Sequence, residues 1–261
     1  MDFKIKITNK EEFKFFIKKL LAVEKFLFIK ITDKNVISSV YFPLKDAVKA
    51  ISVPLSDMFE FDGKIPDKPI KVSFFNGSKI IDALSFLEGD ISAIMSCGLS
   101  DDGNSYVVDD FKLYDGTSKI KLYIGDPRIS FMEMTKDEMA KAFSTNAAVY
   151  KFNMNVDDVN KLNSLFKLDD SSTANESKTF RMRIENGKLL VAGQNYDHVL
   201  KDKVDILDQG GVTEVYIYRK FIPLLDKESY EVTMCVNKVF LKSNDSAALI
   251  TFALCAGMEE D

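Results

Sequence analysis

The 261-residue chain is poor in the residue types on which most catalytic and metal sites depend. It has one histidine, His198, and three cysteines, Cys97, Cys235 and Cys255, without the spacing of a metal site. It also lacks a GxxxxGK(S/T) phosphate loop. These absences argue against an enzyme and against a resident metal or cofactor, so we expect no catalytic residues and no metal ligands.

Long apolar runs are also missing. None approaches the roughly 18 residues that a membrane span requires, and the segment after Met1 alternates directly into a strand without a signal-peptide core. The cysteines lie in apolar strand contexts and are typical of reduced core thiols. We therefore expect a cytoplasmic protein with no membrane partner, in the host cell cytoplasm if the source is viral.

Basic residues do not dominate the composition. The chain has 35 Lys and Arg against 40 Asp and Glu, a net charge of −5. A conventional nucleic-acid binder is basic, so any contact with DNA must be confined to one face.

What is present is one pattern, repeated four times: a strand, a short amphipathic helix, and two or more alternating strands. The copies begin near Lys4, Ile70, Tyr150 and Val215 and fall into two halves of similar length. This repetition predicts an α+β fold of two similar domains, each built from duplicated βαβββ units.

Apolar residues recur at helical spacing in each copy. The stripes are Phe13, Phe16, Ile17, Leu20 and Leu21 in the first copy, Ile80, Ala83, Leu84 and Leu87 in the second, and Val156, Val159, Leu162 and Phe166 in the third. Thr8 with Glu11 predicts a capping box for the first helix, and Asn155 is the candidate cap of the third. Pro223 limits the fourth helix to one or two turns.

The strand segments alternate between apolar and polar residues, which favours antiparallel sheets with one face on a core. Clear examples are Phe180–Glu185, Lys119–Ile124 and Tyr230–Met234. Asn186-Gly187 and Asp115-Gly116 supply hairpin turns between such strands.

The two halves predict domains at 1–126 and 149–261, joined by a connector at 127–148. Within the connector, Lys136–Phe143 has the composition of a short helix. The polar segments 99–110 and 168–178 are typical of surface loops and lack the ligand pattern of a calcium loop.

In this order of elements the chain resembles a DNA sliding clamp, most nearly the two-domain clamps of T-even-type phages and their relatives. The resemblance covers nearly the whole chain and rests on topology, without a signature motif. It is carried by Lys71–Leu87 with the hairpin Phe111–Ile124, and by Arg219–Val232 with the strands Val239–Ser243 and Ala248–Leu254.

The resemblance implies a ring of six domains with helices lining the hole and sheets outside. Two domains per chain then imply a homotrimer of about 88 kDa, three times 29.5 kDa. Such a ring encircles double-stranded DNA, is loaded by an ATP-dependent clamp loader, and tethers a DNA polymerase without catalysis.

Basic residues on the polar sides of the four helices are the expected DNA-facing set, because mobile point charges suit contacts without base readout. They are Lys14, Lys18, Lys19, Lys79, Lys161, Arg219 and Lys220. The alternative is that these lysines only form a solvated helix face.

The resemblance also implies a pocket for partner peptides beside the connector and a contact between subunits. The expected pocket residues are Ile129, Phe131, Met132, Pro223, Phe252 and Leu254, although the connector side chains could instead pin the connector to its own sheet. The expected subunit contact joins the edge Lys119–Ile124, with Lys119, Lys121 and Tyr123, to the edge Val199–Leu207 of the next chain, with Leu200, Lys203 and Asp205.

Two other classes remain open. An enzyme with a duplicated α+β fold would need a concave cluster of titratable groups, which the sequence does not indicate. A phage structural protein or a single-stranded-DNA-binding protein would place aromatic residues on a basic groove. The 21 phenylalanines follow inward-facing patterns, which argues against the latter.

Overall fold

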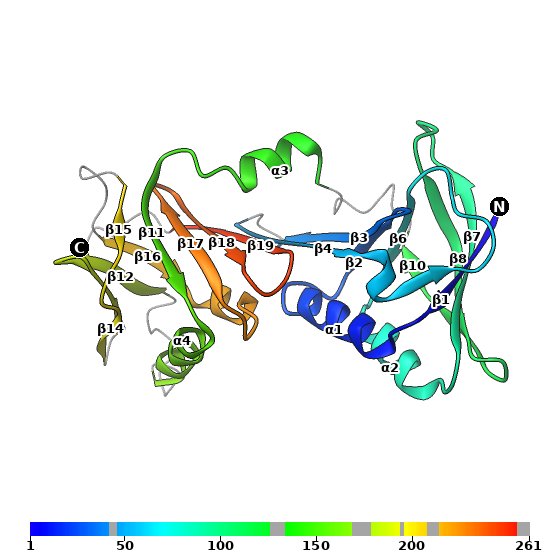
Figure 1. The fold of residues 1–261 in the computed structure, drawn as a ribbon, viewed down its shortest axis with the longest axis horizontal. Helices are drawn as coiled ribbons and strands as arrows, with labels where there is room; N and C mark the ends of the chain where they lie inside the picture. Colours follow the sequence, from blue (N-terminus) through cyan, green and yellow to red (C-terminus); the bar gives the residue numbers. More distant parts are fainter. Residues whose placement is uncertain (42–45, 126–133, 169–178, 194–195, 208–213, 255–261) are drawn as a thin grey trace. The chain divides into compact units, whose positions relative to one another are not determined.

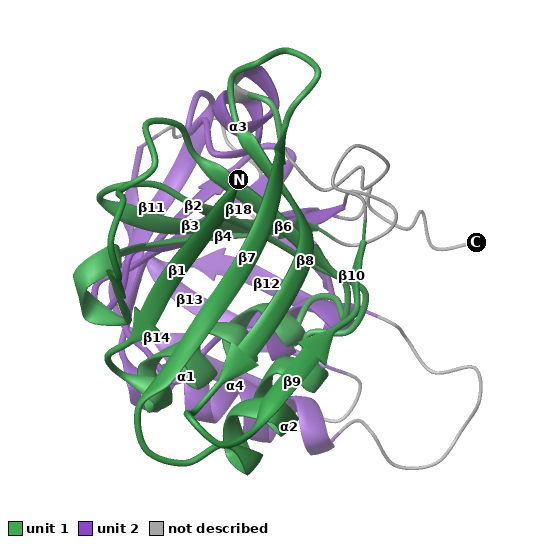
Figure 2. Cartoon of the chain, turned by 90° about the vertical axis from the view of Figure 1, so that its right-hand side faces the viewer, with its two compact units in different colours: residues 1–42, 49–136 green, residues 43–48, 137–261 purple. Residues whose placement is uncertain are grey.

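The computed structural model describes residues 1–41, 46–125, 134–168, 179–193, 196–207 and 214–254. The chain divides into two compact units, shown in different colours in Figure 2. Unit 1 comprises Met1–Phe42 and Lys49–Lys136, and unit 2 comprises Pro43–Val48 and Asp137–Asp261.

Unit 1 contains two βαβββ repeats. The first consists of β1 (Asp2–Ile7), α1 (Lys10–Leu21), β2 (Leu27–Ile31), β3 (Asn35–Tyr41) and β4 (Ala47–Pro54), whose first two residues belong to unit 2. The short elements η1 (Leu55–Asp57) and β5 (Phe59–Phe61) follow. The second consists of β6 (Ile70–Phe74), α2 (Ser78–Phe86), β7 (Ile91–Leu99), β8 (Tyr106–Tyr114), β9 (Lys119–Leu122) and β10 (Ile124–Gly125).

Unit 2 repeats the order after α3 (Lys136–Ala142). Its first repeat consists of β11 (Ala148–Met154), α4 (Val156–Leu168), β12 (Thr179–Glu185), β13 (Lys188–Ala192), β14 (Asp197–Lys201) and β15 (Asp205–Ile206). Its second consists of β16 (Glu214–Tyr218), the 3₁₀ helix η2 (Arg219–Leu224), β17 (Tyr230–Cys235), β18 (Lys238–Ser243) and β19 (Ala248–Ala253). The predicted fourfold βαβββ repetition is therefore confirmed.

Strands distant in sequence close the sheet of each unit. In unit 1, β1 lies antiparallel to β7, with Asp2 opposite Ser96. In unit 2, β11 lies antiparallel to β17, with Ala148 opposite Cys235. Unit 2 also has a sheet in the order β14-β13-β12-β16.

Helices cover one face of the strands within each unit (Figure 1). In unit 1, α1 packs against α2, and its stripe of Phe13, Phe16, Ile17 and Leu20 is buried. Phe13 meets Phe59 of β5 edge-on, with ring centroids 4.8 Å apart. Burial of these apolar side chains is the main favourable contribution to folding of the unit.

The 3₁₀ helix η2 contributes buried side chains to the core of unit 2. Phe221 is fully buried and stacks on Phe252 of β19 at 5.2 Å. Pro223 lies inside this 3₁₀ helix, so the fourth helix is short, as predicted.

The helix starts correct one prediction and confirm another. The cap of α1 is Asn9, whose side chain accepts the amide of Glu12 at 3.0 Å, and not Thr8 with Glu11. The predicted cap of α4 is correct: Asn155 accepts the amide of Asp158 at 2.9 Å, and Asp158 accepts that of Asn155 at 2.8 Å. None of the helices in the described ranges combines the length and the apolar composition of a membrane-spanning helix.

Candidate functional site

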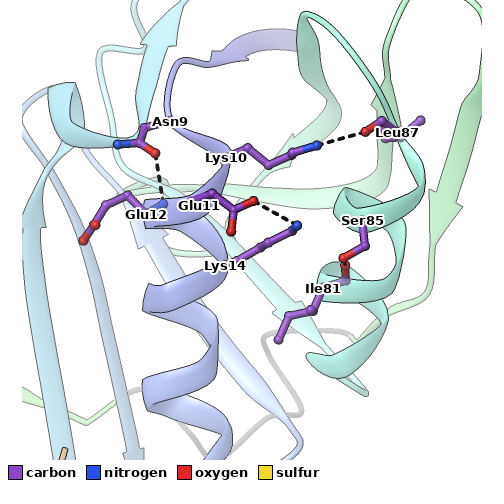
Figure 3. Close-up of polar contacts among 8 residues, drawn as sticks. All are labelled: Asn9, Lys10, Glu11, Glu12, Lys14, Ile81, Ser85 and Leu87. Carbon is purple, nitrogen blue, oxygen red and sulfur yellow. Dashed lines mark hydrogen bonds and ion pairs between the residues drawn. The ribbon is translucent and has the colours of Figure 1, made fainter. Parts of the chain in front are cut away.

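The basic residues of α1 do not share one exposed face. Lys14 points toward α2 and pairs with Glu11 at 3.1 Å, and its side chain is only 13% exposed (Figure 3). Lys19 is buried, with its ammonium 4.4 Å from the centroid of the Phe15 ring. The prediction that Lys14, Lys18 and Lys19 all project outward is therefore wrong for two of them, and only Lys18 is exposed.

The reason is the packing of α2 beside α1. Lys10 at the start of α1 donates to the carbonyl oxygen of Leu87 at 3.1 Å, just past the end of α2 (Figure 3). This contact joins the two helices of unit 1 on the side where Lys14 lies. A helical wheel of α1 alone cannot show which lysines a neighbouring helix covers.

The helices α2 and α4 supply three exposed lysines. Lys79 of α2 is exposed and pairs with Asp82 at 3.1 Å. Lys161 of α4 is exposed, as predicted, and so is Lys167 in the last turn of α4, which we did not predict. Lys167 follows the apolar stripe residue Phe166. Its position outside the stripe is the sequence signal that could have predicted its exposure.

The two basic residues of η2 have partners within unit 2. Lys220 pairs with Asp46, and its ammonium also lies 5.0 Å from the centroid of the Phe221 ring. The guanidinium of Arg219 lies 5.8 Å from the centroid of the Phe166 ring. On α1, α2 and α4 the exposed lysines are Lys18, Lys79, Lys161 and Lys167, which we call the lysine set.

A groove of about 570 Å³ lies in unit 2 beside the end of the predicted connector. It is lined by Ala142 and Ala147 on one side, by Val236 and Lys238 at the β17–β18 turn, and by residues of β19. The Lys238 ammonium donates to the carbonyl oxygens of Lys141 at 2.7 Å and Ala142 at 2.9 Å, the last residues of α3. Lys238 thereby fixes α3 as one wall, which we call the α3 groove.

The predicted partner-pocket residues mostly lie elsewhere. Ile129, Phe131 and Met132 fall outside the described residues. Phe252 is a buried core residue stacked on Phe221 and does not line the α3 groove. Pro223 is exposed on η2. Leu254 is nearest the α3 groove, because its amide donates to Asn237 in the groove lining.

The structure divides the predicted subunit edge of unit 2, Val199–Leu207, between two strands. Among the described residues, β9 pairs with β8, and Tyr123 just after β9 is 86% exposed. The segment 199–207, however, bends where the amide of Val204 donates to Gly187, so that β14 pairs with β13 whereas β15 pairs with β11. Leu200 is buried, and Lys203 and Asp205 are exposed.

Reactive groups do not gather in the described part of the chain. No group of three or more His, Cys, Asp or Glu side chains there is placed to hold a metal ion. Burial raises the pKa of the Cys97 thiol to about 12 and also raises the pKa of Cys235. Both thiols are therefore protonated at neutral pH and are poor nucleophiles.

Comparison with solved structures identifies the fold. The chain superposes on the PCNA of A. fulgidus, solved with the C-terminal region of FEN-1 bound, with a TM-score of 0.62, 12% identity and coverage of 99% of this chain and 100% of that chain. The Bacillus subtilis DNA polymerase sliding clamp gives a TM-score of 0.64 and 13% identity, over 100% of this chain and 67% of that longer one.

A third structure, the Helicobacter pylori beta clamp bound to a DNA ligase peptide, gives a TM-score of 0.63 and 12% identity, over 100% of this chain and 68% of that chain. No protein-family model matches the sequence, and no curated protein matches it. The chain therefore has the sliding-clamp fold over its whole length.

Proposed function

We propose that this chain is a sliding clamp, which encircles duplex DNA as a ring-shaped homotrimer and tethers a replicative DNA polymerase. One observation carries the proposal: four βαβββ repeats, two in each unit, with the fold of sliding clamps from end to end. A ring that encloses the DNA can tether a polymerase without any catalytic group. The proposal includes an ATP-dependent loader that opens the ring. It also includes the prediction that the chain is most similar to phage-type clamps.

The lysine set supports contact with DNA that is independent of sequence. Its four members lie on α1, α2 and α4, the helices that would line the hole, and their side chains are exposed. Single ammonium groups on flexible stems bind phosphates without reading bases. Four such residues in a chain of net charge −5 favour loose contacts that allow sliding.

The α3 groove is the proposed docking site for a partner peptide. It is open, lies where α3 meets the β17–β18 turn, and presents the exposed side chain of Val236 at its rim. Two similar folds have been solved with a bound segment of another replication protein, the C-terminal region of FEN-1 and a DNA ligase peptide. A polymerase tail with apolar side chains would suit this groove.

The test separates enclosure from ordinary affinity. The protein is loaded by its cognate loader onto nicked circular DNA, washed at high salt, and followed before and after the circle is cut. Retention on the circle with loss after linearisation supports the ring, since a closed ring leaves DNA only at an end. Equal retention on both forms would mean that contacts hold the protein.

The same experiment judges the alternative of a single-stranded-DNA-binding protein. In the described part of the chain, Phe15, Phe75 and Phe86 are exposed, which corrects our expectation that the phenylalanines face inward. Exposed aromatic rings can stack on bases. That alternative predicts tight binding to linear single strands without a loader and no dependence on circularity.

A further inference from the structure

The α3 groove of unit 2 is bordered by β19, the last strand of the chain. Thr251 and Ala253 of this strand are part of the groove lining. Leu254, just past β19, donates its amide to the carbonyl oxygen of Asn237, another lining residue, at 3.0 Å. Residues 255–261, which lie outside the described residues, therefore begin at the rim of the groove.

The charged side chains of the groove lining are mainly basic. Lys141 and Lys238 line the groove, and neither is ion-paired with a carboxylate of the described residues. The Lys238 ammonium uses two of its three hydrogens on the carbonyl oxygens of Lys141 and Ala142, which leaves one for a further acceptor. The one acidic residue of the described lining, Asp46, is already paired with Lys220. A carboxylate that enters the groove would therefore meet uncompensated positive charge.

The groove wall at the β17–β18 turn is preformed. The side chain of Val236 is 55% exposed there, and its amide donates to the carbonyl oxygen of Ala147 at 3.3 Å. Ala147 has a φ of 62°, a left-handed conformation that is uncommon for a residue with a side chain. Residues held in such conformations cluster at binding sites. A wall that is already in place loses little conformational entropy when a ligand covers it.

The segment 255–261 has a composition that complements the groove. Its sequence, CAGMEED, has carboxylates at Glu259, Glu260 and Asp261 and contains no Lys or Arg. Met258 supplies an unbranched apolar side chain, which adapts to irregular surfaces. The segment thus combines an apolar side chain with acidic groups, whereas the groove combines an exposed valine with two lysines.

We propose that residues 255–261 occupy the α3 groove of their own chain. Met258 then packs against Val236. The three carboxylates then face Lys141 and Lys238, and opposite charges make the fit specific.

The proposal rests on the proposed function and deepens it, because the segment competes with the partner peptide for the same groove. A segment tethered beside its site acts at an effective concentration on the order of millimolar, so even weak contacts fill the groove most of the time. A partner must displace it. A groove that is free for only a fraction of the time binds the partner with an apparent affinity reduced by that fraction.

The first test places a fluorophore on the groove. The chain has no tryptophan, so Val236→Trp introduces a single reporter at the rim. The tail variant combines Met258→Ser, Glu259→Gln and Glu260→Gln in the full chain. We expect the reporter emission to shift to the red in the tail variant, because the ring is then exposed to water. Unchanged emission would overturn the proposal. The control reporter is Ile65→Trp, at an exposed site of unit 1, whose emission should be the same with either tail.

The second test reverses charges to detect direct contact. Lys141→Glu with the wild-type tail should also shift the reporter emission to the red, since carboxylates then face a carboxylate. Adding Glu259→Lys and Glu260→Lys should restore the blue emission. Lys227→Glu, at an exposed site outside the groove lining, is the control and should leave the emission unchanged. A red shift that the tail lysines do not reverse would mean that Lys141→Glu acts on α3 alone, and would overturn the contact.

The third test measures competition. The probe is a fluorescein-labelled peptide with the terminal sequence of the cognate polymerase, and its binding is followed by anisotropy. We expect the tail variant to bind the probe about threefold to tenfold more tightly than the wild type, as expected if the segment occupies the groove for about two thirds to nine tenths of the time. Equal affinities would overturn the proposal.

The outcomes also separate this inference from the proposed function. The reporter experiments need no DNA, loader or polymerase, so a reporter that does not respond to the tail overturns this inference and leaves retention on circular DNA as the test of the ring. Equal retention on circular and linear DNA overturns the ring even where the reporter responds to the tail. A response that depends on protein concentration would assign the segment to the groove of a second copy and overturn the proposal.

Discussion

The amide of Glu88, just past α2, donates to the carboxylate of Asp115 at the β8–β9 turn, at 3.1 Å. The other oxygen of Asp115 accepts the amides of Thr117 at 2.9 Å and Ser118 at 2.7 Å. One side chain thus orders the turn before β9 and ties it to the end of α2. These bonds, led by that from Ser118, hold the pKa of Asp115 well below its usual 3.8.

We expect D115N to lower the melting temperature, because the asparagine NH₂ faces the amide of Glu88, donor against donor. The folded pKa is depressed, so the stabilisation is fully present above the unfolded pKa and is lost as pH falls through the folded one. The gap between wild type and D115N should therefore be constant from pH 7 to 5 and shrink below about 3.8. Thermal unfolding of both proteins between pH 7 and 2 measures this gap.

Asp33→Asn is the control for loss of one charge, since Asp33 is exposed in a loop. A gap between wild type and D115N that widens on acidification would contradict the assignment.

The lysine set gives a prediction on DNA. Replacing Lys18, Lys161 and Lys167 by Glu should leave folding intact, because all three are exposed. Processive synthesis should fall by about threefold to tenfold at low salt, with a smaller deficit as salt screens the charges. Primer extension across a salt series with loaded clamp provides the measurement.

A matched control carries Glu at Lys34, Lys64 and Lys227, which are exposed and lie off the helices. It changes net charge by the same amount. Equal loss in both triple variants would indicate a general charge effect and remove the lysine set from the DNA-facing surface.

Lys238 gives a prediction for the α3 groove. K238M removes the ammonium that binds the carbonyl oxygens of Lys141 and Ala142, so the end of α3 loses its cap. Hydrogen exchange should accelerate several-fold in 137–143, and a polymerase tail peptide should bind more weakly. Lys242→Met on the same strand is the control, because Lys242 is exposed. Faster exchange with unchanged peptide binding would place the docking site elsewhere.

Phe252 gives a prediction for stability. Phe252→Ala removes a buried ring that stacks on Phe221, and should lower the free energy of unfolding by about 3–5 kcal/mol. Ile65→Ala, at an exposed site, should change it by no more than about 0.5 kcal/mol. Denaturant unfolding compares the two. A small effect at Phe252 would show that the ring is not part of the core.

Local patterns were enough to predict the fold, because each depends on a few neighbouring residues. The stripe from Phe13 to Leu20 fixed the buried face of α1, and Asn155 fixed the start of α4. Thr8 failed as a cap next to a non-local contact: its amide donates to the carbonyl oxygen of Met58 at 2.9 Å, and the helix begins after Asn9. The sequence near Thr8 carries no sign of that partner.

The site was harder to predict because exposure is set by neighbours from other elements. Lys14 is covered on the side of α2, and Phe252 is covered by η2. Phe86 shows the opposite error, because we expected the phenylalanines to face inward. It lies off the stripe of Ile80, Ala83 and Leu84 and is exposed. An aromatic residue outside an apolar stripe is the signal that could have indicated this exposed side chain.

The pairing of β1 with β7 and of β11 with β17 bears on how the chain is made. Asp2 leaves the ribosome long before Ser96, and Ala148 long before Cys235, so each of these pairs closes a long loop late and slowly. During synthesis β1 and β11 therefore each have one unpaired edge until β7 and β17 have been made. A chaperone or a neighbouring nascent chain can bind that edge in the meantime.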